Sequence, residues 1–137
     1  CGNASTNGGG CANGTTNGAI LSGSGSDSVS AANLVLSGTD MIANQPGLYF
    51  QGDNAINSGS GVAFGDGLRC AGGGVIRLQV VFPDATGASA TTIDVGAKGG
   101  VAAGDVKRYQ VWYRDPATST CGAQFNLTNG IELTWSA

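Results

Sequence analysis

The sequence has no histidine, a single glutamate and only six lysine and arginine residues among its 137 positions. Without histidine, catalytic triads and dyads that use imidazole as a base are excluded. Six scattered cations and a formal net charge of -3 argue against nucleic acid as a partner. No apolar run approaches the ~18 residues of a transmembrane helix, so we predict no membrane span.

The remaining catalytic groups are also poorly placed. Lys98 and Lys107 are available for a Ser–Lys pair, but no GxSxG turn presents a serine. Most aspartates adjoin Gly, Asn, Pro or Ser, as turn-capping residues do. We therefore predict that the protein is not an enzyme. A hydrolase using two aspartates stays an alternative, and it requires a solvent-open pair of carboxyl groups.

Four cysteines, Cys1, Cys11, Cys70 and Cys121, lie in a chain rich in Gly, Ser, Thr and Asn. An even number in such a chain predicts disulfides and a secreted, extracellular or cell-surface protein. Of the three possible pairings we expect Cys1–Cys11, across a flexible glycine-rich loop, and Cys70–Cys121. Free thiols or a zinc site are the alternative, although no CxxC pair is present. Because the chain begins at cysteine, we expect a processed or excised chain, with a lipidated Cys1 as the competing hypothesis.

Short alternating apolar segments bounded by turn residues predict an all-β protein. The expected strands are Ala19–Leu21, Asn33–Leu36, Gly47–Gln51, Val75–Val81, Thr91–Val95, Tyr109–Arg114 and Gly130–Trp135. Helix signals are nearly absent. There is no linker and no clear repeat, so we predict one domain over residues 1–137.

The two-residue period assigns the faces of these strands. It groups Ile76 and Leu78 with Val80, and it covers both faces of 109–114, which should therefore be a central strand. Two antiparallel sheets packed face to face would bury these stripes. The predicted fold is an antiparallel two-sheet β-sandwich of jelly-roll or Greek-key type, stapled by disulfides, with a small barrel as the alternative.

Two segments are more specific than the composition, GVAFGDGLRCAGGGVIRL at 61–78 and YQVWYRDPATSTCGAQFNLTNGIELTW at 109–135. With the early cysteines and the "GL-aromatic-F" strand at 47–50, they resemble a recurrent extracellular β-domain of bacterial secreted proteins. The residues that carry the resemblance are Cys1, Cys11, Gly47, Leu48, Tyr49, Phe50, Phe64, Gly65, Gly67, Cys70, Arg77, Leu78, Gln110, Trp112, Arg114, Asp115, Pro116, Asn126, Thr128 and Asn129. The resemblance implies a secreted, disulfide-bearing β-domain and implies no reaction.

Candidate ligand-binding residues follow from the strand faces. Trp112, Arg114 and Gln110, with Tyr49 and Gln51, are the candidates for a platform on which an aromatic ring stacks against a sugar. The competing interpretation makes the tryptophan a core residue and lets Arg114 pair with Asp66 or Glu132. No cofactor is required. Asp53, Asn54, Asn57 and Asp66 supply oxygen atoms for a possible calcium site, which ordinary turn chemistry explains equally well.

Two functions from different classes fit this sequence. The first is a non-catalytic structural or adhesive domain that assembles with its own copies in a fibre or surface layer, because low charge and uncharged strand edges favour pairing. The second is a carbohydrate-binding module of a secreted bacterial hydrolase, with a surface glycan as partner. An exposed row of Trp and Tyr would favour the second function, and burial of those rings would favour the first.

Overall fold

The computed structural model describes residues 1–137, and nearly all of its regular structure is β. The strands are β1 (Ile20–Ser24), β2 (Val35–Thr39), β3 (Gly47–Gly52), β4 (Asn54–Ala55), β5 (Val62–Phe64), β6 (Gly67–Arg69), β7 (Ala71–Gly72), β8 (Ile76–Val81), β9 (Ser89–Ala90), β10 (Val106–Arg114), β11 (Phe125–Leu127) and β12 (Ile131–Thr134). The helical segments are a 3-10 turn, Ile56–Gly59, and one short helix, α1 (Val95–Gly99). No helix is both long and apolar enough to cross a bilayer.

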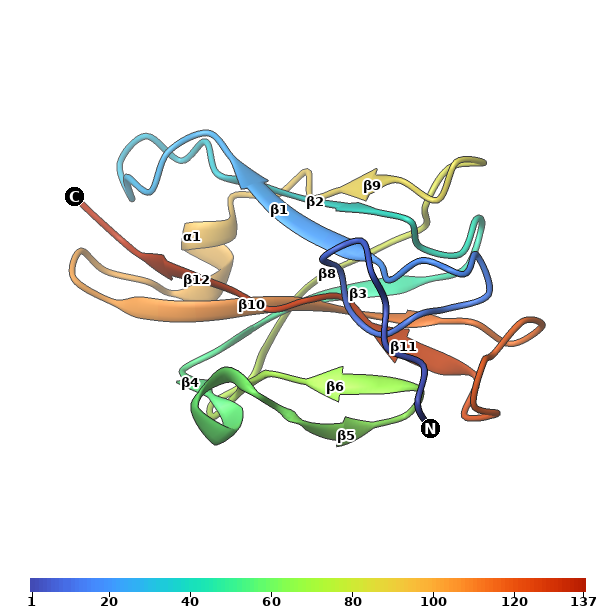
Figure 1. Cartoon of the computed structure of the whole chain (residues 1–137). Helices are drawn as coiled ribbons and strands as arrows, with labels where there is room; N and C mark the ends of the chain where they lie inside the picture. Colours follow the sequence, from blue (N-terminus) through green and yellow to red (C-terminus); the bar gives the residue numbers. More distant parts are fainter.

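The strands form antiparallel sheets stacked in layers (Figure 1). The upper layer is the three-stranded sheet β1-β2-β9, and the central layer is the five-stranded sheet β11-β10-β3-β8, in which β12 also pairs with β10. Below the central sheet lie the β5–β6 hairpin and the short β4–β7 pair. The predicted antiparallel all-β fold is confirmed, with the two larger sheets forming a sandwich and the hairpin adding a partial third layer.

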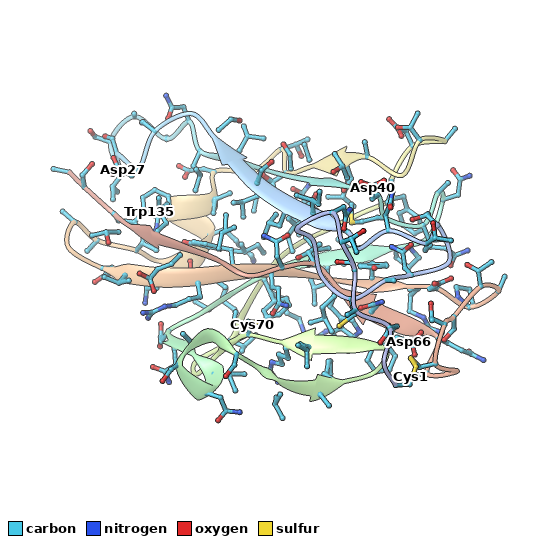
Figure 2. All side chains as sticks on the ribbon, viewed as in Figure 1. Cys1, Asp27, Asp40, Asp66, Cys70 and Trp135 are labelled. Atoms are coloured by element: carbon cyan, nitrogen blue, oxygen red, sulfur yellow. A yellow bond between two sulfur atoms is a disulfide. The ribbon has the colours of Figure 1, made fainter.

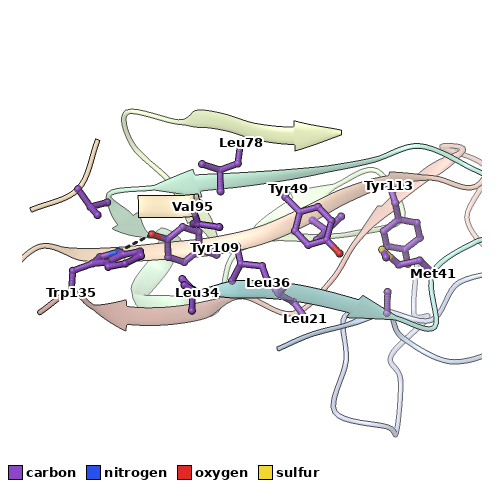
Figure 3. Close-up of a cluster of buried hydrophobic side chains, with 13 residues drawn as sticks. Leu21, Leu34, Leu36, Met41, Tyr49, Leu78, Val95, Tyr109, Tyr113 and Trp135 are labelled. Carbon is purple, nitrogen blue, oxygen red and sulfur yellow. Dashed lines mark hydrogen bonds between the residues drawn. The ribbon is translucent and has the colours of Figure 1, made fainter. Parts of the chain in front are cut away.

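The main core fills the space between the upper and central sheets (Figure 3). It is built around three tyrosines, which alternate with residues on the other face of β3 and β10. The thirteen buried members are Ala19, Leu21, Leu34, Leu36, Met41, Tyr49, Leu78, Val95, Val101, Tyr109, Val111, Tyr113 and Trp135. A second, smaller cluster of Phe50, Ala71 and Leu127 lies on the opposite face of the central sheet. The prediction that strand 109–114 is central and covered on both faces is confirmed.

Two local predictions are wrong for identifiable reasons. Segment Thr91–Val95 is not a strand, because the Asp94 carboxylate accepts a hydrogen bond of 3.0 Å from the Ala97 N–H and starts helix α1 instead. Val80 does not share a face with Leu78, because the register shifts between Tyr49 and Phe50, where β8 pairs with β3. This bulge turns Val80 to the face opposite the main core, where it is 56% exposed.

The N-terminal segment, residues 1–18, is bonded to the chain's own sheets. The Asn3 side chain donates to the carbonyl oxygens of Ala12 and Asp66 at 2.9 and 2.7 Å. Gly10 lies so close to β11 that a Cβ there would meet the Leu127 carbonyl oxygen at 2.1 Å, so only glycine fits. These contacts fix a segment that its glycine content alone would leave frayed.

Candidate functional site

The main candidate site is a groove between the central sheet and the β5–β6 hairpin, which we call the β8 groove. It has a volume of 170 Å³ and is lined by Leu48, Phe50, Phe64, Arg69, Val75, Arg77 and Trp112. That volume is comparable to an engineered cavity of about 150 Å³ that holds one benzene ring. The β8 groove therefore suits one ring or one branched apolar side chain.

Strand pairing explains why these residues meet. In the central sheet Leu48 pairs with Trp112 across β3 and β10, and Phe50 pairs with Arg77 across β3 and β8. Paired residues of antiparallel strands project to the same face, so all four lie on the face away from the main core. The hairpin then adds Phe64 of β5 and Arg69 of β6 to the lining of the groove.

Two rings of an aromatic cluster, those of Phe64 and Trp112, line the β8 groove. The rings of Phe64, Trp112 and Phe125 contact each other edge to face, with centroid separations of 5.2 to 5.7 Å. Each such pair contributes about 0.5–1.5 kcal/mol beyond area burial. The Trp112 Nε1–H is buried here and has no hydrogen-bond partner. Trp112 thus holds the hairpin against the sheet while one part of its ring lines the groove.

The charges at the β8 groove are positive and unpaired. Lys107 forms an ion pair with Asp53 at 2.7 Å, and Arg108 forms one with Glu132 at 2.8 Å. Arg69 and Arg77 form none; the Arg69 guanidinium lies 5.8 Å from the Phe64 ring centroid and donates to the Ala71 carbonyl. In a chain of net charge -3, two free guanidinium groups beside an apolar groove favour an apolar partner that carries a carboxylate or another anion.

The structure divides the predicted ligand platform between two faces. Trp112 lines the β8 groove and is half-buried, and Arg114 is exposed at the end of β10 without either expected ion pair. Tyr49 and Gln51 are buried on the opposite face of the central sheet. The sequence prediction overlooked Arg69 and Arg77 as groove residues, although both lie in the distinctive 61–78 segment and are among only six cations.

Gln110, the fifth platform residue, is fully buried and holds loops together. Its side-chain oxygen accepts from the N–H groups of Cys70 and Ala71 at 2.9 and 3.2 Å. Its side-chain nitrogen donates to the carbonyl oxygens of Leu68 and Thr128 at 2.8 and 2.7 Å. All four hydrogen-bonding positions are therefore occupied by backbone, and Gln110 positions the strand that follows the β5–β6 hairpin.

The predicted disulfide pairing is wrong. Cys1 is bonded to Cys121, with the two Cα atoms 5.8 Å apart, while Cys11 and Cys70 are not bonded. The reason is the path of the N-terminal segment, which runs beside the 115–124 loop: Gly14 donates to Asp115, and Thr120 donates to the Ala12 carbonyl. Cys1, labelled in Figure 2, therefore lies against the loop that carries Cys121.

Two of the calcium candidates, Asp53 and Asp66, are bonded to other groups. Asp53 binds Lys107, and no group of three or more Cys, Asp or Glu side chains is arranged to hold a metal ion. The buried Asp66 carboxylate accepts hydrogen bonds from the Ser119 hydroxyl at 2.6 Å and the Ala123 N–H at 3.0 Å. Burial opposes ionisation, but these bonds and those from Cys121 and Thr120 outweigh it, so the pKa of Asp66 is lowered. Asp66 thus organises the loop that carries Cys121.

Replacing Asp66 with alanine should lower the free energy of unfolding by about 2–3 kcal/mol, because the buried donors lose their acceptor. Since the folded pKa is lowered, the stabilisation is complete above the ordinary carboxyl pKa and is lost as the pH falls through the lowered value. Urea unfolding between neutral and acidic pH measures both effects. Asp66→Asn is the matched control, and it should remove this pH dependence. Equal stability of Asp66→Ala and wild type would contradict the role.

No known protein family, curated protein or solved structure matches this chain. The function must therefore be inferred from the site itself.

Proposed function

We propose that this chain is a non-catalytic, secreted structural or adhesive domain that associates with other copies of itself. The observation that carries the proposal is an apolar strip along the outermost strand of the central sheet. Val75, Val80 and Phe82 on and beside β8 are 42%, 56% and 63% exposed. We call these three residues the β8 strip.

The edge of β8 is a natural place for strand addition. β8 pairs with β3 on one side and with no strand on the other. An unpaired edge presents free backbone N–H and C=O groups, and proteins usually protect it with several charges or with proline. Here β8 carries Arg77 as its only charged residue, and the strip on its surface is apolar. Pairing with a neighbour would bury both the edge and the strip.

A second copy fits this surface on grounds of charge. Charged residues form only 11% of the chain, which lowers repulsion between copies. The chain has nine acidic side chains and six basic ones, so a second copy can offer carboxylates to the unpaired Arg69 and Arg77. Residues 1–18 are held by their own sheets and by the Cys1–Cys121 disulfide. Association would therefore use the β8 edge and not an exchanged N-terminal segment.

Secretion is supported by the same disulfide. Bonds of this type persist in oxidising compartments and are rare in the cytosol. The resemblance to extracellular β-domains of bacterial secreted proteins points the same way. Localisation of the full-length chain by fractionation of the producing cell tests this part of the proposal, which a cytosolic location would overturn.

Sedimentation velocity at increasing concentration tests association. We expect the wild type to form larger species and Val80→Lys to weaken association at least tenfold, a change of about 1.4 kcal/mol. Val106→Lys is the matched control, because Val106 is also exposed (38%) but lies on β10 opposite Thr134 of β12, outside both the strip and the groove lining. A wild type that stays monomeric at every concentration, or equal effects of both variants, would overturn the proposal.

Carbohydrate binding is the second candidate, favoured by Trp112 in the β8 groove. Its weakness is that Tyr49, Tyr113 and Trp135 are all buried, so no row of exposed rings exists for a sugar chain. Tryptophan fluorescence during titration with oligosaccharides, repeated on Trp112→Phe, separates this function from self-association. A saturable change that the variant lacks would favour carbohydrate binding.

A further inference from the structure

The two cysteines outside the disulfide line one cavity. Cys11 and Cys70 lie 59 positions apart in the sequence, yet both border a pocket beside Gly10 and Gly130. Both are half-buried. Their backbones are fixed independently, since the Cys11 carbonyl accepts from the Asn126 side chain and the Cys70 N–H donates to Gln110. The fold therefore presents two thiols to the same space from two different segments.

Two glycines, Gly61 and Gly130, lie close to the Cys70 side chain. A Cβ placed on Gly61 would lie 3.1 Å from the Cys70 sulfur, and one on Gly130 would lie 3.1 Å from the Cys70 Cβ. Larger side chains at either position would crowd this thiol. The glycines thus leave the cavity open around Cys70.

Electrostatics shows that the two thiols affect each other. Burial raises the pKa of the Cys70 thiol, and the negative charge of a Cys11 thiolate raises it further. No third ligand joins them, because no group of three or more Cys, Asp or Glu side chains is placed to bind a metal. Two thiols that line one cavity in an oxidising compartment can instead be oxidised to a disulfide.

We propose that Cys11 and Cys70 are an oxidation site that closes into a second disulfide. With glutathione disulfide as oxidant, the Cys11 thiolate attacks one of its sulfur atoms, forms a mixed disulfide and releases one glutathione thiolate. Cys70 gives up its proton and attacks the Cys11 sulfur, which releases the second glutathione. Two protein S–H bonds are lost and one S–S bond forms, while glutathione disulfide takes up the two electrons and becomes two thiols.

Closure would attach the N-terminal segment at a second point. The Cys1–Cys121 bond fixes it to the 115–124 loop, and the Cys11–Cys70 bond would fix it to the junction of β6 and β7. This junction borders the strand that Gln110 holds. The inference rests on the oxidising compartment of the proposed function and does not depend on self-association, so disulfide mapping and sedimentation can fail independently.

Disulfide mapping of the whole protein tests the inference. The folded protein that keeps the Cys1–Cys121 bond and has Cys11 and Cys70 as thiols is equilibrated with glutathione disulfide, alkylated and digested with trypsin, which cuts after Arg69 but not between Cys1 and Cys11. The expected product joins residues 1–69 both to residues 115–137, through the Cys1–Cys121 bond, and to residues 70–77, and tandem fragmentation between positions 1 and 11 assigns the second bond to Cys11. The closed protein should melt several degrees above the form with two free thiols.

The double variant Cys11→Ser/Cys70→Ser is the matched control, and it should keep the melting temperature of the open wild type under both conditions. Three results would overturn the inference: separate glutathione adducts on Cys11 and Cys70, a direct bond between Cys70 and Cys121 in place of Cys1–Cys121, or two thiols that stay free at equilibrium. Each of these outcomes leaves the sedimentation test of self-association unaffected.

Discussion

Replacing Cys1 and Cys121 with serine should lower the free energy of unfolding by about 5 kcal/mol. The bond joins residues 120 positions apart, and the loop-closure model assigns about 4.7 kcal/mol to a loop of 100 residues. Domains of this size have total stabilities of about 5–15 kcal/mol. Loss of this single bond should therefore remove a third or more of the stability, as measured by urea unfolding.

The effect should come mainly from the unfolded chain. In the folded state the N-terminal segment keeps its own hydrogen bonds, such as Asn3 to the Asp66 carbonyl and Gly14 to the Asp115 carboxylate. The native circular dichroism spectrum should therefore be unchanged in the variant, while the midpoint of unfolding shifts. A spectrum that changes under native conditions would show that these hydrogen bonds fail without the disulfide.

Single variants provide the control for the double one. Cys1→Ser and Cys121→Ser each break the same bond, so each should cost as much as both together, and the coupling energy should equal the whole effect. Cys11→Ser/Cys70→Ser keeps the Cys1–Cys121 bond and reports on the other two cysteines alone. A loss below about 1 kcal/mol in Cys121→Ser would contradict the loop-closure argument.

The sandwich could be predicted from the sequence because the alternation within its longer strands is regular. Tyr109, Val111 and Tyr113 face the main core while Gln110 and Trp112 face the other way, as a two-residue period requires. Alternation fails where one hydrogen bond or one extra residue changes the geometry. The Asp94 cap and the β8 bulge are such cases, and neither can be recognised from the alternation of apolar and polar residues in the sequence.

The site and the disulfide could not be predicted in the same way, because both depend on distant segments. The β8 groove combines residues of β3, β5, β6, β8 and β10 with Val75, and only the packing of the hairpin brings Arg69 and Arg77 to one place. The pairing of Cys1 depends on the path of residues 1–18 along β11, which loop length does not reveal. Closeness in the sequence favoured Cys11 as the partner of Cys1, whereas the path of the folded chain brings Cys121 to it.

The second large effect concerns alkaline pH. All three tyrosines of the chain, Tyr49, Tyr109 and Tyr113, are completely buried. The Tyr109 hydroxyl donates to Gln51 and accepts from the Trp135 Nε1–H, each at 2.9 Å. Figure 3 shows the second of these bonds. The protein therefore has no tyrosine that can ionise in contact with water while it is folded.

Burial raises the pKa of each of these phenols. For Tyr109 it reaches about 12, with the Trp135 bond opposing the rise and the charge of Asp105 adding to it. The pKa of Tyr113 is raised more strongly by burial, and that of Tyr49 is also raised, against the hydrogen bonds to Ser89 and Gly38. All three folded pKa values thus lie above the ordinary value of about 10 for tyrosine in an unfolded chain.

The sign of the pH effect follows from these directions. Below pH ~10 both states are protonated and stability is complete; above it the unfolded chain loses protons that the folded chain retains, so stability falls. Each tyrosine that stays protonated in the folded state contributes up to about 1.4 kcal/mol per pH unit, so Tyr109 and Tyr113 together contribute about 2 kcal/mol between pH 10 and 11, and Tyr49 adds to this loss. The loss should continue until the pH passes the raised folded values.

Absorbance at the tyrosinate band, followed together with circular dichroism, tests this prediction. It is best measured on Cys11→Ser/Cys70→Ser, in which no free thiol titrates. We expect the three tyrosines to ionise together, at the pH where the fold is lost, and gradually around pH ~10 in denaturant. Tyr113→Phe should reduce the pH slope by up to about 1.4 kcal/mol per pH unit, because the pKa of Tyr113 is raised most strongly. Tyrosinate that appears near pH ~10 while the circular dichroism stays native would show that a ring is accessible and that the tyrosine core is looser than the structure has it.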